Sequence, residues 1–201
     1  MWITIRLYWR FKRGLLKPTH SAQSKIADGG EALEVTKKIA EYVVNTSLED
    51  FPPEAITGAK AAIIDCIGCA LAGSREPLAD VLVDYLNDLG GNHTATVIGR
   101  GFKTNSPDAG LINGAMSHAL DYDDITVITK THPSAVLIPA ALPMAEEVGS
   151  SGSDMLLAYL LGFEVACAVG DAINTLYYLS LIHISEPTRR YAISYAVFCL
   201  K

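Results

Sequence analysis

GLINGAMSHALDYDDITVITKTHPSAVLIP, residues 110–139, is the stretch that decides the fold of this chain and the place of its chemistry. Two apolar segments flank a short run that is dense in ionisable and hydroxyl groups. That run contains three carboxylates, two imidazoles and several hydroxyls, among them Asp121, Asp123, Asp124, His118, His132, Thr126, Thr129, Thr131 and Ser134. Because groups this polar lie between segments that favour burial, the pattern predicts two helices joined by a loop that carries a functional site.

The helix ends around this loop place charged groups against the helix dipoles. Asn105 and Pro107 are typical of a helix start, and the apolar spacing that follows predicts a helix that runs to Asp121. His132 directly precedes Pro133, a favoured first-turn residue of a second helix. Acids at a helix C-terminus and a histidine at a helix N-terminus are both unfavourable. Two such placements on one loop are typical of a functional site.

The composition is that of a folded globular chain. Its 201 residues are 50% apolar and 19% charged, and the net charge of -6 argues against a nucleic-acid surface. The long apolar runs are interrupted by charged residues such as Lys60, Asp65 and Glu164, so no membrane span is predicted. Cys66 and Cys69 form a C-x-x-C pattern inside an apolar helical run, which favours two buried thiols in a reducing compartment over a redox pair.

Helical periodicity extends over most of the remaining sequence. Helices are predicted at residues 33–47, 53–71, 76–89, 134–148 and 155–173, and one strand is predicted at 93–101. The helix that begins at Pro53 is apolar on all sides, which predicts a central position. Pro139 and Pro143 are predicted to kink the helix after the loop or to break it into short pieces. The fold class is therefore predicted to be all-α, with one short extended segment.

Both ends of the sequence differ from the helical part. Residues 1–27 carry several Lys and Arg residues and no acid, which is typical of a mitochondrial presequence or of upstream sequence translated from a wrong start codon. LSLIHISEPTR, residues 179–189, and ISYAVFCL, residues 193–200, match the in-frame translation of a sequencing-library adapter and its flow-cell primer. The predicted organisation is a non-domain extension at 1–30, a partial helical domain at 31–178 and adapter read-through at 179–201.

Four segments resemble the N-terminal part of the MmgE/PrpD family: NGAMSHALDYDD, THPSAVLIPAALPMAEE, GSDMLLAYLLGFEVACAVG and DCIGCALAGS. That family includes 2-methylcitrate dehydratase and cis-aconitate decarboxylase, and the resemblance covers residues 33–174. It implies an all-α main domain, a smaller α+β lid domain, and a homodimer without metal or other cofactor. The lid and the later active-site segment have no counterpart in this sequence, so the resemblance implies a truncated helical domain.

The resemblance also implies roles for single residues of the loop. Asp121 matches the first acid of the family's active-site motif and His132 matches its histidine, so both are predicted to be catalytic. Thr126, Ser134 and Asp124 are predicted to bind substrate. Loss of water from a hydroxy-tricarboxylate, or of CO₂ from an unsaturated one, requires proton transfer at a carbon next to a carboxylate. An imidazole, or a carboxylate among like charges, can perform that transfer.

Several of these residues also have a plainer interpretation. The family often has Thr directly after its Asp pair, where this chain has Ile125, so Thr126 is only a candidate for that hydroxyl contact. His118 lies on an apolar helix face and fits a hydrogen-bonded core histidine. Asp123 and Asp124 fit a role in bracing the loop.

The predicted function is a fragment of a lyase that acts on a small polycarboxylate, by dehydration of a 2-methylcitrate-like substrate or decarboxylation of a cis-aconitate-like one. The truncated fragment is predicted to be inactive. The expected location is cytoplasmic, or the mitochondrial matrix if residues 1–30 are a presequence, and no nucleic-acid or membrane partner is expected. The alternative function is a divalent-metal-binding helical module without catalysis, in which Asp121, Asp123, Asp124 and His132 bind Mn²⁺ or Mg²⁺.

Overall fold

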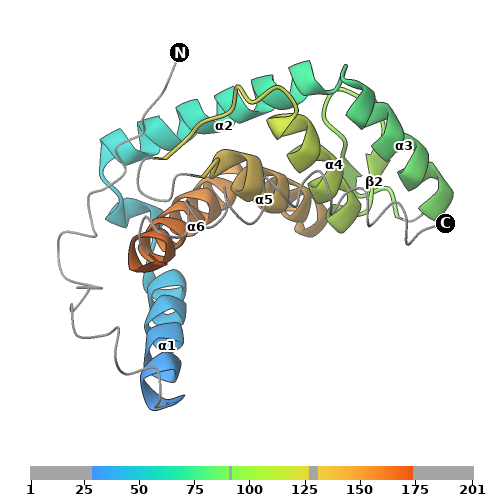
Figure 1. Ribbon diagram of the computed structural model, residues 1–201. Coiled ribbons are helices and arrows are strands. Elements are labelled where there is room, and N and C mark those ends of the chain that lie inside the picture. Colours follow the sequence, from blue (N-terminus) through green and yellow to red (C-terminus); the bar gives the residue numbers. More distant parts are fainter. Residues whose placement is uncertain (1–28, 91, 127–130, 174–201) are drawn as a thin grey trace.

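The computed structural model describes residues 29–90, 92–126 and 131–173 (Figure 1). Its elements are α1 (Gly29–Asn45), the 3-10 helix η3 (Leu48–Asp50), α2 (Pro53–Gly73), α3 (Pro77–Leu89), β1 (Ala95–Thr96), β2 (Lys103–Thr104), α4 (Ser106–His118), α5 (Ser134–Val148) and α6 (Gly152–Ile173). The predicted all-α class is confirmed, because the strands are only two residues long. The predictions for residues 1–28 and 179–201 lie outside the described residues.

The helix starts follow short sequence signals. Asn105 caps α4, where its side-chain oxygen accepts the Asp108 N–H at 3.0 Å and Pro107 follows in the first turn. The Ser151 hydroxyl accepts the Asp154 N–H at 3.2 Å, and the Asp154 carboxylate accepts the Ser151 N–H at 3.1 Å. These bonds satisfy N–H groups that have no partner within the helix. α6 begins at Gly152, three residues before the predicted start at 155, because the bonds between Ser151 and Asp154 already form its first turn.

α2 lies along one edge of the helical layer, with α4, α5 and α6 packed on one side of it (Figure 1). Its buried positions are small residues at helical spacing: Ala55, Ala59, Ala62, Cys66, Ala70 and Gly73. A Cβ added at Gly73 would lie 2.0 Å from the Met116 carbonyl oxygen, so α4 approaches the α2 backbone directly. On the uncovered side Ile64 is 72% exposed. The prediction of a central helix is therefore wrong for the described residues, because α2 has neighbours on one side only.

α5 is one helix that contains both Pro139 and Pro143, so of the two predicted outcomes, a kink or a break into short pieces, the break does not occur. Pro139 cannot donate the backbone hydrogen bond that the Ala135 carbonyl would otherwise accept. α4 packs against this part of α5 through two glycines. Added Cβ atoms at Gly110 and Gly114 would lie 3.1 Å from the Pro139 oxygen and 3.3 Å from the Ala135 oxygen. This close packing stabilises α5 where its own hydrogen-bond ladder is interrupted.

β1 and β2 form a short antiparallel hairpin. The predicted strand at 93–101 is therefore too long, because the chain turns at Gly99, where φ is 74°. Asn113 of α4 holds this turn in place. Its side-chain oxygen accepts the Ile98 N–H, and its amide donates to the Thr96 carbonyl, both at 2.9 Å. The hairpin is thus fixed to the same helix that leads into the central loop.

α2 and α6 are each long and apolar enough to cross a membrane, judged by length and composition alone. Both helices contribute to one hydrophobic core, in which Ala59 and Ala62 of α2 pack with Tyr159 and Leu160 of α6. A core helix meets the same criterion of length and composition as a membrane span. The observation therefore assigns no membrane to this chain.

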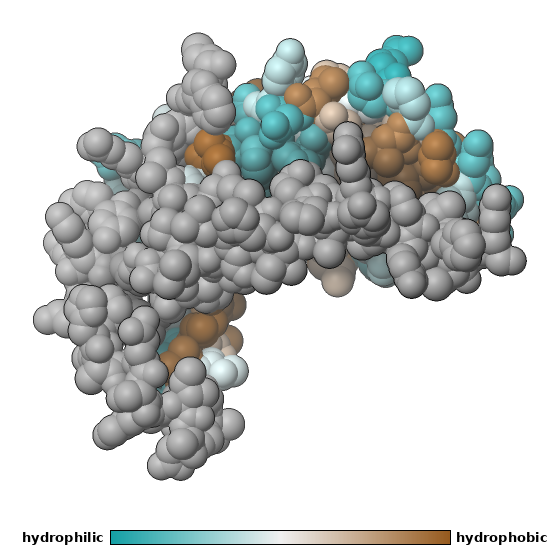
Figure 2. Space-filling model, viewed as in Figure 1, coloured by the Kyte–Doolittle hydropathy of each residue, from teal (hydrophilic) through white to brown (hydrophobic). Residues whose placement is uncertain are grey.

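α3 has an apolar stripe on its outer side. The stripe consists of Leu78, Val81, Tyr85 and Leu89, which are 45–65% exposed and recur at helical spacing. Figure 2 shows hydrophobic surface over this helix. The inner side of α3 is also apolar and packs into a second core with α4. Leu78 also lines a cavity beside the central loop.

Candidate active site

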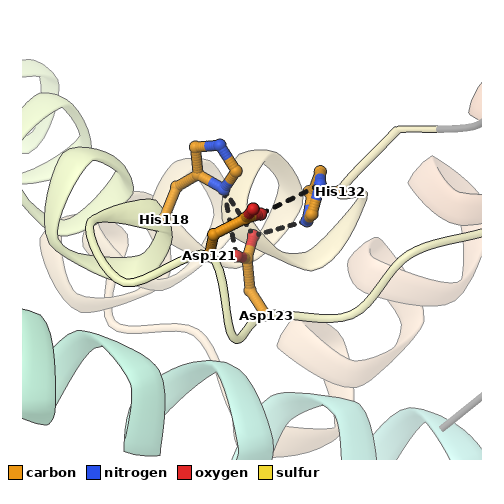
Figure 3. A group of neighbouring side chains, drawn as sticks. All are labelled: His118, Asp121, Asp123 and His132. Carbon is orange, nitrogen blue, oxygen red and sulfur yellow. Dashed lines mark hydrogen bonds and ion pairs between the residues drawn. The ribbon is translucent and has the colours of Figure 1, made fainter. Parts of the chain in front are cut away.

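α4 and the start of α5 bring two histidines together across the central loop (Figure 3). α4 ends at His118, three residues before the predicted end, and Asp121 has a left-handed backbone conformation with φ of 54°. This conformation is uncommon outside glycine, although Asp adopts it more readily than most residues. His132 lies just before α5, and its ring centroid is 4.5 Å from that of His118.

The Asp123 carboxylate contacts both imidazole rings. Its side chain has no exposed surface, and His118 Nδ1 lies 3.0 Å from Oδ1 and 3.2 Å from Oδ2. His132 Nδ1 lies 3.2 Å from Asp123 Oδ2, which is ion-pair distance, but the angle is not that of a hydrogen bond. This buried nitrogen has no hydrogen-bond partner in the described part of the chain. Because a buried carboxylate is unfavourable without polar partners, Asp123 favours a conformation with both imidazoles beside it.

Asp121 contacts the other ring nitrogen of His132. Its Oδ1 lies 3.6 Å from His132 Nε2, and its side chain is 77% exposed. The structure therefore brings together the two residues that the sequence predicts to be catalytic, with a carboxylate near each nitrogen of the His132 ring. We refer to His118, Asp121, Asp123 and His132 as the histidine–aspartate cluster (Figure 3).

A cavity of about 450 Å³ opens beside this cluster. It is lined by Leu78, Gly114, Ala115, His118, Ala119, Thr131, His132, Ala135 and Val136. A cavity of this size accepts a small organic molecule. Among the described residues the lining contains no Lys or Arg, and the polar side-chain groups that it offers are the two imidazoles and the Thr131 hydroxyl.

Asp124 has different partners from its neighbour Asp123. Its Oδ1 accepts the Ser134 N–H at 3.1 Å, and its Oδ2 accepts the Ser134 hydroxyl at 2.7 Å. The Ser134 oxygen lies 2.9 Å from the Tyr159 hydroxyl, which donates to it because the Ser134 proton is already used. Cys66 Sγ donates to the Ser134 carbonyl at 3.4 Å. We refer to Asp124, Ser134, Tyr159 and Cys66 as the anchor cluster, which ties the loop to α5, α6 and α2.

Burial controls the ionisation of the anchor cluster. It raises the pKa of Asp124, an effect that the hydrogen bonds from Ser134 oppose and the nearby Asp123 carboxylate increases. Burial also raises the pKa of the Cys66 thiol to about 12 and that of Tyr159 above its ordinary value. Cys66 is therefore an uncharged, buried thiol, as the sequence pattern predicts, and its surroundings disfavour redox chemistry. Cys69, which the same pattern predicts to be buried as well, is only partly buried.

The N-terminal domain of the MmgE/PrpD family matches residues 37–196, which is most of the chain. The chain belongs to the MmgE/PrpD family. This MmgE/PrpD chain is similar to the cis-aconitate decarboxylase of Aspergillus terreus, with 30% identity over 152 residues. That alignment covers 73% of this chain and 31% of the relative.

Two further relatives show the same pattern of coverage. A cis-aconitate decarboxylase-like protein of Aspergillus oryzae is 28% identical, over 73% of this chain and 32% of its own length. The human cis-aconitate decarboxylase is 28% identical, over 65% of this chain and 28% of its own length. This MmgE/PrpD chain thus spans about a third of the length of the curated relatives that it matches.

The family match confirms the resemblance that the sequence motifs carry. The matched residues 37–196 include residues 179–196, most of the segment that we predict to be adapter read-through. This segment lies outside the described residues, and the read-through prediction stays a prediction.

The three residues predicted to bind substrate are buried in this MmgE/PrpD domain. Ser134 is 1% exposed, Thr126 is 6% exposed and Asp124 is 9% exposed. The Ser134 hydroxyl already makes hydrogen bonds to Asp124 and Tyr159 in the anchor cluster. In this position it holds the loop, and its proton is not available to a ligand in the cavity. The substrate contacts of these residues stay predictions.

His118 and Asp123 join the site, although their sequence context also fits a core histidine and a bracing acid. The five-residue separation of His118 and Asp123 is the feature of the sequence that could have identified them as partners. His118 is the last residue of α4, so its side chain lies where the chain folds back, within reach of an acid five residues later. That inference needs the helix to end at His118, whereas the apolar spacing predicts an end at Asp121.

Proposed function

We propose that this chain is the helical part of a lyase that acts on a small polycarboxylate, by loss of CO₂ from a cis-aconitate-like substrate or of water from a 2-methylcitrate-like one. The observation that carries the proposal is the position of His132 at the cavity, with Asp121 near one ring nitrogen and Asp123 near the other. The relatives named cis-aconitate decarboxylase favour loss of CO₂ over loss of water.

Both reactions require one group that transfers a proton. Loss of CO₂ leaves an electron pair on a substrate carbon, which must then take a proton from a nearby acid. Loss of water needs a base that removes a proton from a carbon next to a carboxylate, and an acid that gives a proton to the departing hydroxyl group. An imidazole performs either step near neutral pH, and His132 is the imidazole with a carboxylate near each nitrogen.

Asp123 acts in this proposal as a positioning residue. Its buried carboxylate lies 3.2 Å from His132 Nδ1 and restrains the ring, so that Nε2 remains available to the substrate or to Asp121. Asp121 is mostly exposed and can exchange protons with solvent or substrate. The proposal thus gives the two carboxylates of the cluster different roles.

The groups that bind the substrate carboxylates belong, in this proposal, to other parts of the enzyme. No Lys or Arg lines the cavity among the described residues, and the chain spans about a third of its relatives' length. A polycarboxylate needs cationic partners. We therefore propose that the complete enzyme, as a homodimer, supplies them, and that the 201-residue chain alone has no measurable turnover.

The test uses the enzyme encoded by the uninterrupted gene, with cis-aconitate and 2-methylcitrate as substrates. Asp121→Asn and His132→Gln remove the titrating groups while they keep similar size and hydrogen bonding. Each should lower kcat by about 10²- to 10⁴-fold and change KM much less, because the lost interaction is made in the transition state. His93→Gln, at an exposed histidine of the hairpin region, is the matched control and should leave kcat unchanged.

A near-normal kcat in His132→Gln would contradict the assignment of His132 as the proton-transfer group. A metal-binding module without catalysis is the alternative function. Membership of a family with decarboxylase relatives favours the lyase.

A further inference from the structure

We infer that the histidine–aspartate cluster also binds a divalent transition-metal ion such as Zn²⁺, and that the bound ion inhibits the enzyme. The metal-binding part of this inference is independent of the proposed function, whereas the inhibitory part rests on it. One ligand atom from each of His118, Asp121, Asp123 and His132 can be chosen so that all four lie within 4.8 Å of one another.

The distances within the cluster are close to those of a tetrahedral site. Bonds of about 2.0–2.1 Å at a tetrahedral angle place two ligand atoms about 3.3 Å apart. Asp123 Oδ2 lies 3.2 Å from His118 Nδ1 and 3.2 Å from His132 Nδ1, so one carboxylate oxygen has both imidazole nitrogens at nearly this distance. Asp121 needs the largest adjustment, and its side chain is 77% exposed and has room to rotate.

His132 Nδ1 is a second and independent indication of a ligand. This nitrogen is buried, lies beside a buried carboxylate and makes no hydrogen bond to any described residue. Buried polar atoms normally have a partner. An ion between His132 and Asp123 would supply one.

The donor types and charges select the class of ion. Two imidazoles and two carboxylates suit Zn²⁺ and similar transition metals, whereas Mg²⁺ and Ca²⁺ prefer oxygen ligands alone. The two carboxylates give the cluster a charge that a dication neutralises. Asp124 does not belong to this ligand set, contrary to the alternative predicted from sequence, because both of its oxygens accept hydrogen bonds from Ser134.

A metal at this position would inhibit and not assist the proposed reaction. It would bind His132 Nδ1 and the Asp121 carboxylate. Asp123 would then no longer hold the His132 ring, and Asp121 would no longer lie beside Nε2, as the proposed proton transfer requires. It would also stand beside the cavity that His118 and His132 line. Binding of the ion and turnover are therefore expected to exclude one another.

The binding test uses the metal-free 201-residue chain and needs no substrate. Titration with Zn²⁺ against a chromogenic chelator should show one tightly bound ion per chain, and Mg²⁺ should not compete. His118→Asn and Asp123→Asn should each weaken Zn²⁺ binding about 10- to 100-fold or more. His93→Asn and Asp108→Asn change the same residue types outside the cluster and should bind Zn²⁺ as the parent does.

A variant that folds poorly would lose Zn²⁺ binding for that reason alone. Thermal unfolding of chains that fold normally therefore supplies a second measurement of Zn²⁺ binding. Zn²⁺ should raise the Tm of the parent chain and of His93→Asn, because an ion that binds only the folded state stabilises it. Absence of a Tm rise in the parent, or Zn²⁺ affinity that survives both cluster variants, would overturn the metal site.

The inhibitory part is tested separately in the complete enzyme. Micromolar free Zn²⁺ should abolish turnover, and a chelator should restore it. Full activity with Zn²⁺ bound would overturn inhibition and leave the lyase assignment intact. Zn²⁺ binding in a complete enzyme that converts no polycarboxylate would instead contradict the lyase assignment and leave the metal site intact.

Discussion

Asp123 and Asp124 are adjacent in the chain and both are buried, yet they belong to two regions with different properties. Asp123 lies in the histidine–aspartate cluster, where its partners are two imidazoles beside a cavity. Asp124 lies in the anchor cluster, where both of its oxygens accept bonds from Ser134. In the first region carboxylate oxygens lie 3.0–3.6 Å from imidazole nitrogens, and in the second a carboxylate accepts hydrogen bonds from the backbone and the hydroxyl of a serine.

This difference separates the groups available for chemistry from those that hold the loop. Asp121 and both histidines keep exposed surface, so a ligand or proton can reach them. The anchor cluster joins three helices to one loop residue and has little contact with solvent. Changes in the first region should therefore alter reaction rates or ion binding, and changes in the second should alter stability.

The largest effect on stability is expected for Asp124→Ala. The change leaves the buried Ser134 N–H, in the first turn of α5, without its acceptor. An unsatisfied buried donor should lower the free energy of unfolding by about 1–3 kcal/mol, measured by urea denaturation. Asp84→Ala, at an exposed position of α3, is the control and should change it by less than about 0.5 kcal/mol. Equal losses in both variants would remove the distinction between the two regions.

A smaller effect is expected in the pH dependence of stability. Because burial raises the pKa of Asp124, the folded chain retains this proton at pH values where the unfolded chain has lost it. Its contribution to stability is thus greatest below the ordinary value of 3.8 and falls as the pH rises through the raised folded pKa. The free energy of unfolding of the parent minus that of Asp124→Asn should decrease over this window. A difference that increases with pH would show that the carboxylate is stabilised in its ionised form.

The smallest effect on stability is expected for Asp121→Asn. The side chain is 77% exposed, and Asn also adopts the positive φ of 54° found at this position. The free energy of unfolding should therefore change by less than about 0.5 kcal/mol. Asp121→Val retains no polar group and places a β-branched residue at positive φ, so it should be clearly less stable. If Asp121→Asn were as destabilising as Asp124→Ala, Asp121 would belong with the anchor residues.

The sequence predicts the helices well where the signals are local. Asn105 and Ser151 determine helix starts by bonds that span three residues, so no knowledge of the rest of the fold is needed. The position of α2 depends instead on which neighbours pack against it. α2 is apolar on both sides, so its sequence does not show which side is covered by other helices. In the structure Ile64 lies on the uncovered side and is exposed.

The loop shows the same limit at the level of single side chains. The sequence identifies Asp121 and His132 as partners, and the structure brings them together. The sequence does not show that Asp123 and Asp124 have different partners, because their directions depend on backbone angles such as the positive φ of Asp121. His118 joins the site only because α4 ends there.

Cys66 offers a way to observe how often this part of the molecule opens. Its thiol is 1% exposed and lies 3.5 Å from the Ser117 hydroxyl oxygen on α4 and 3.4 Å from the Ser134 carbonyl oxygen on α5. An alkylating reagent can reach it only when α2 separates from both helices. In a chain whose other cysteines, Cys69, Cys167 and Cys199, are replaced by serine, the rate of Cys66 modification therefore reports the frequency of that local opening under native conditions.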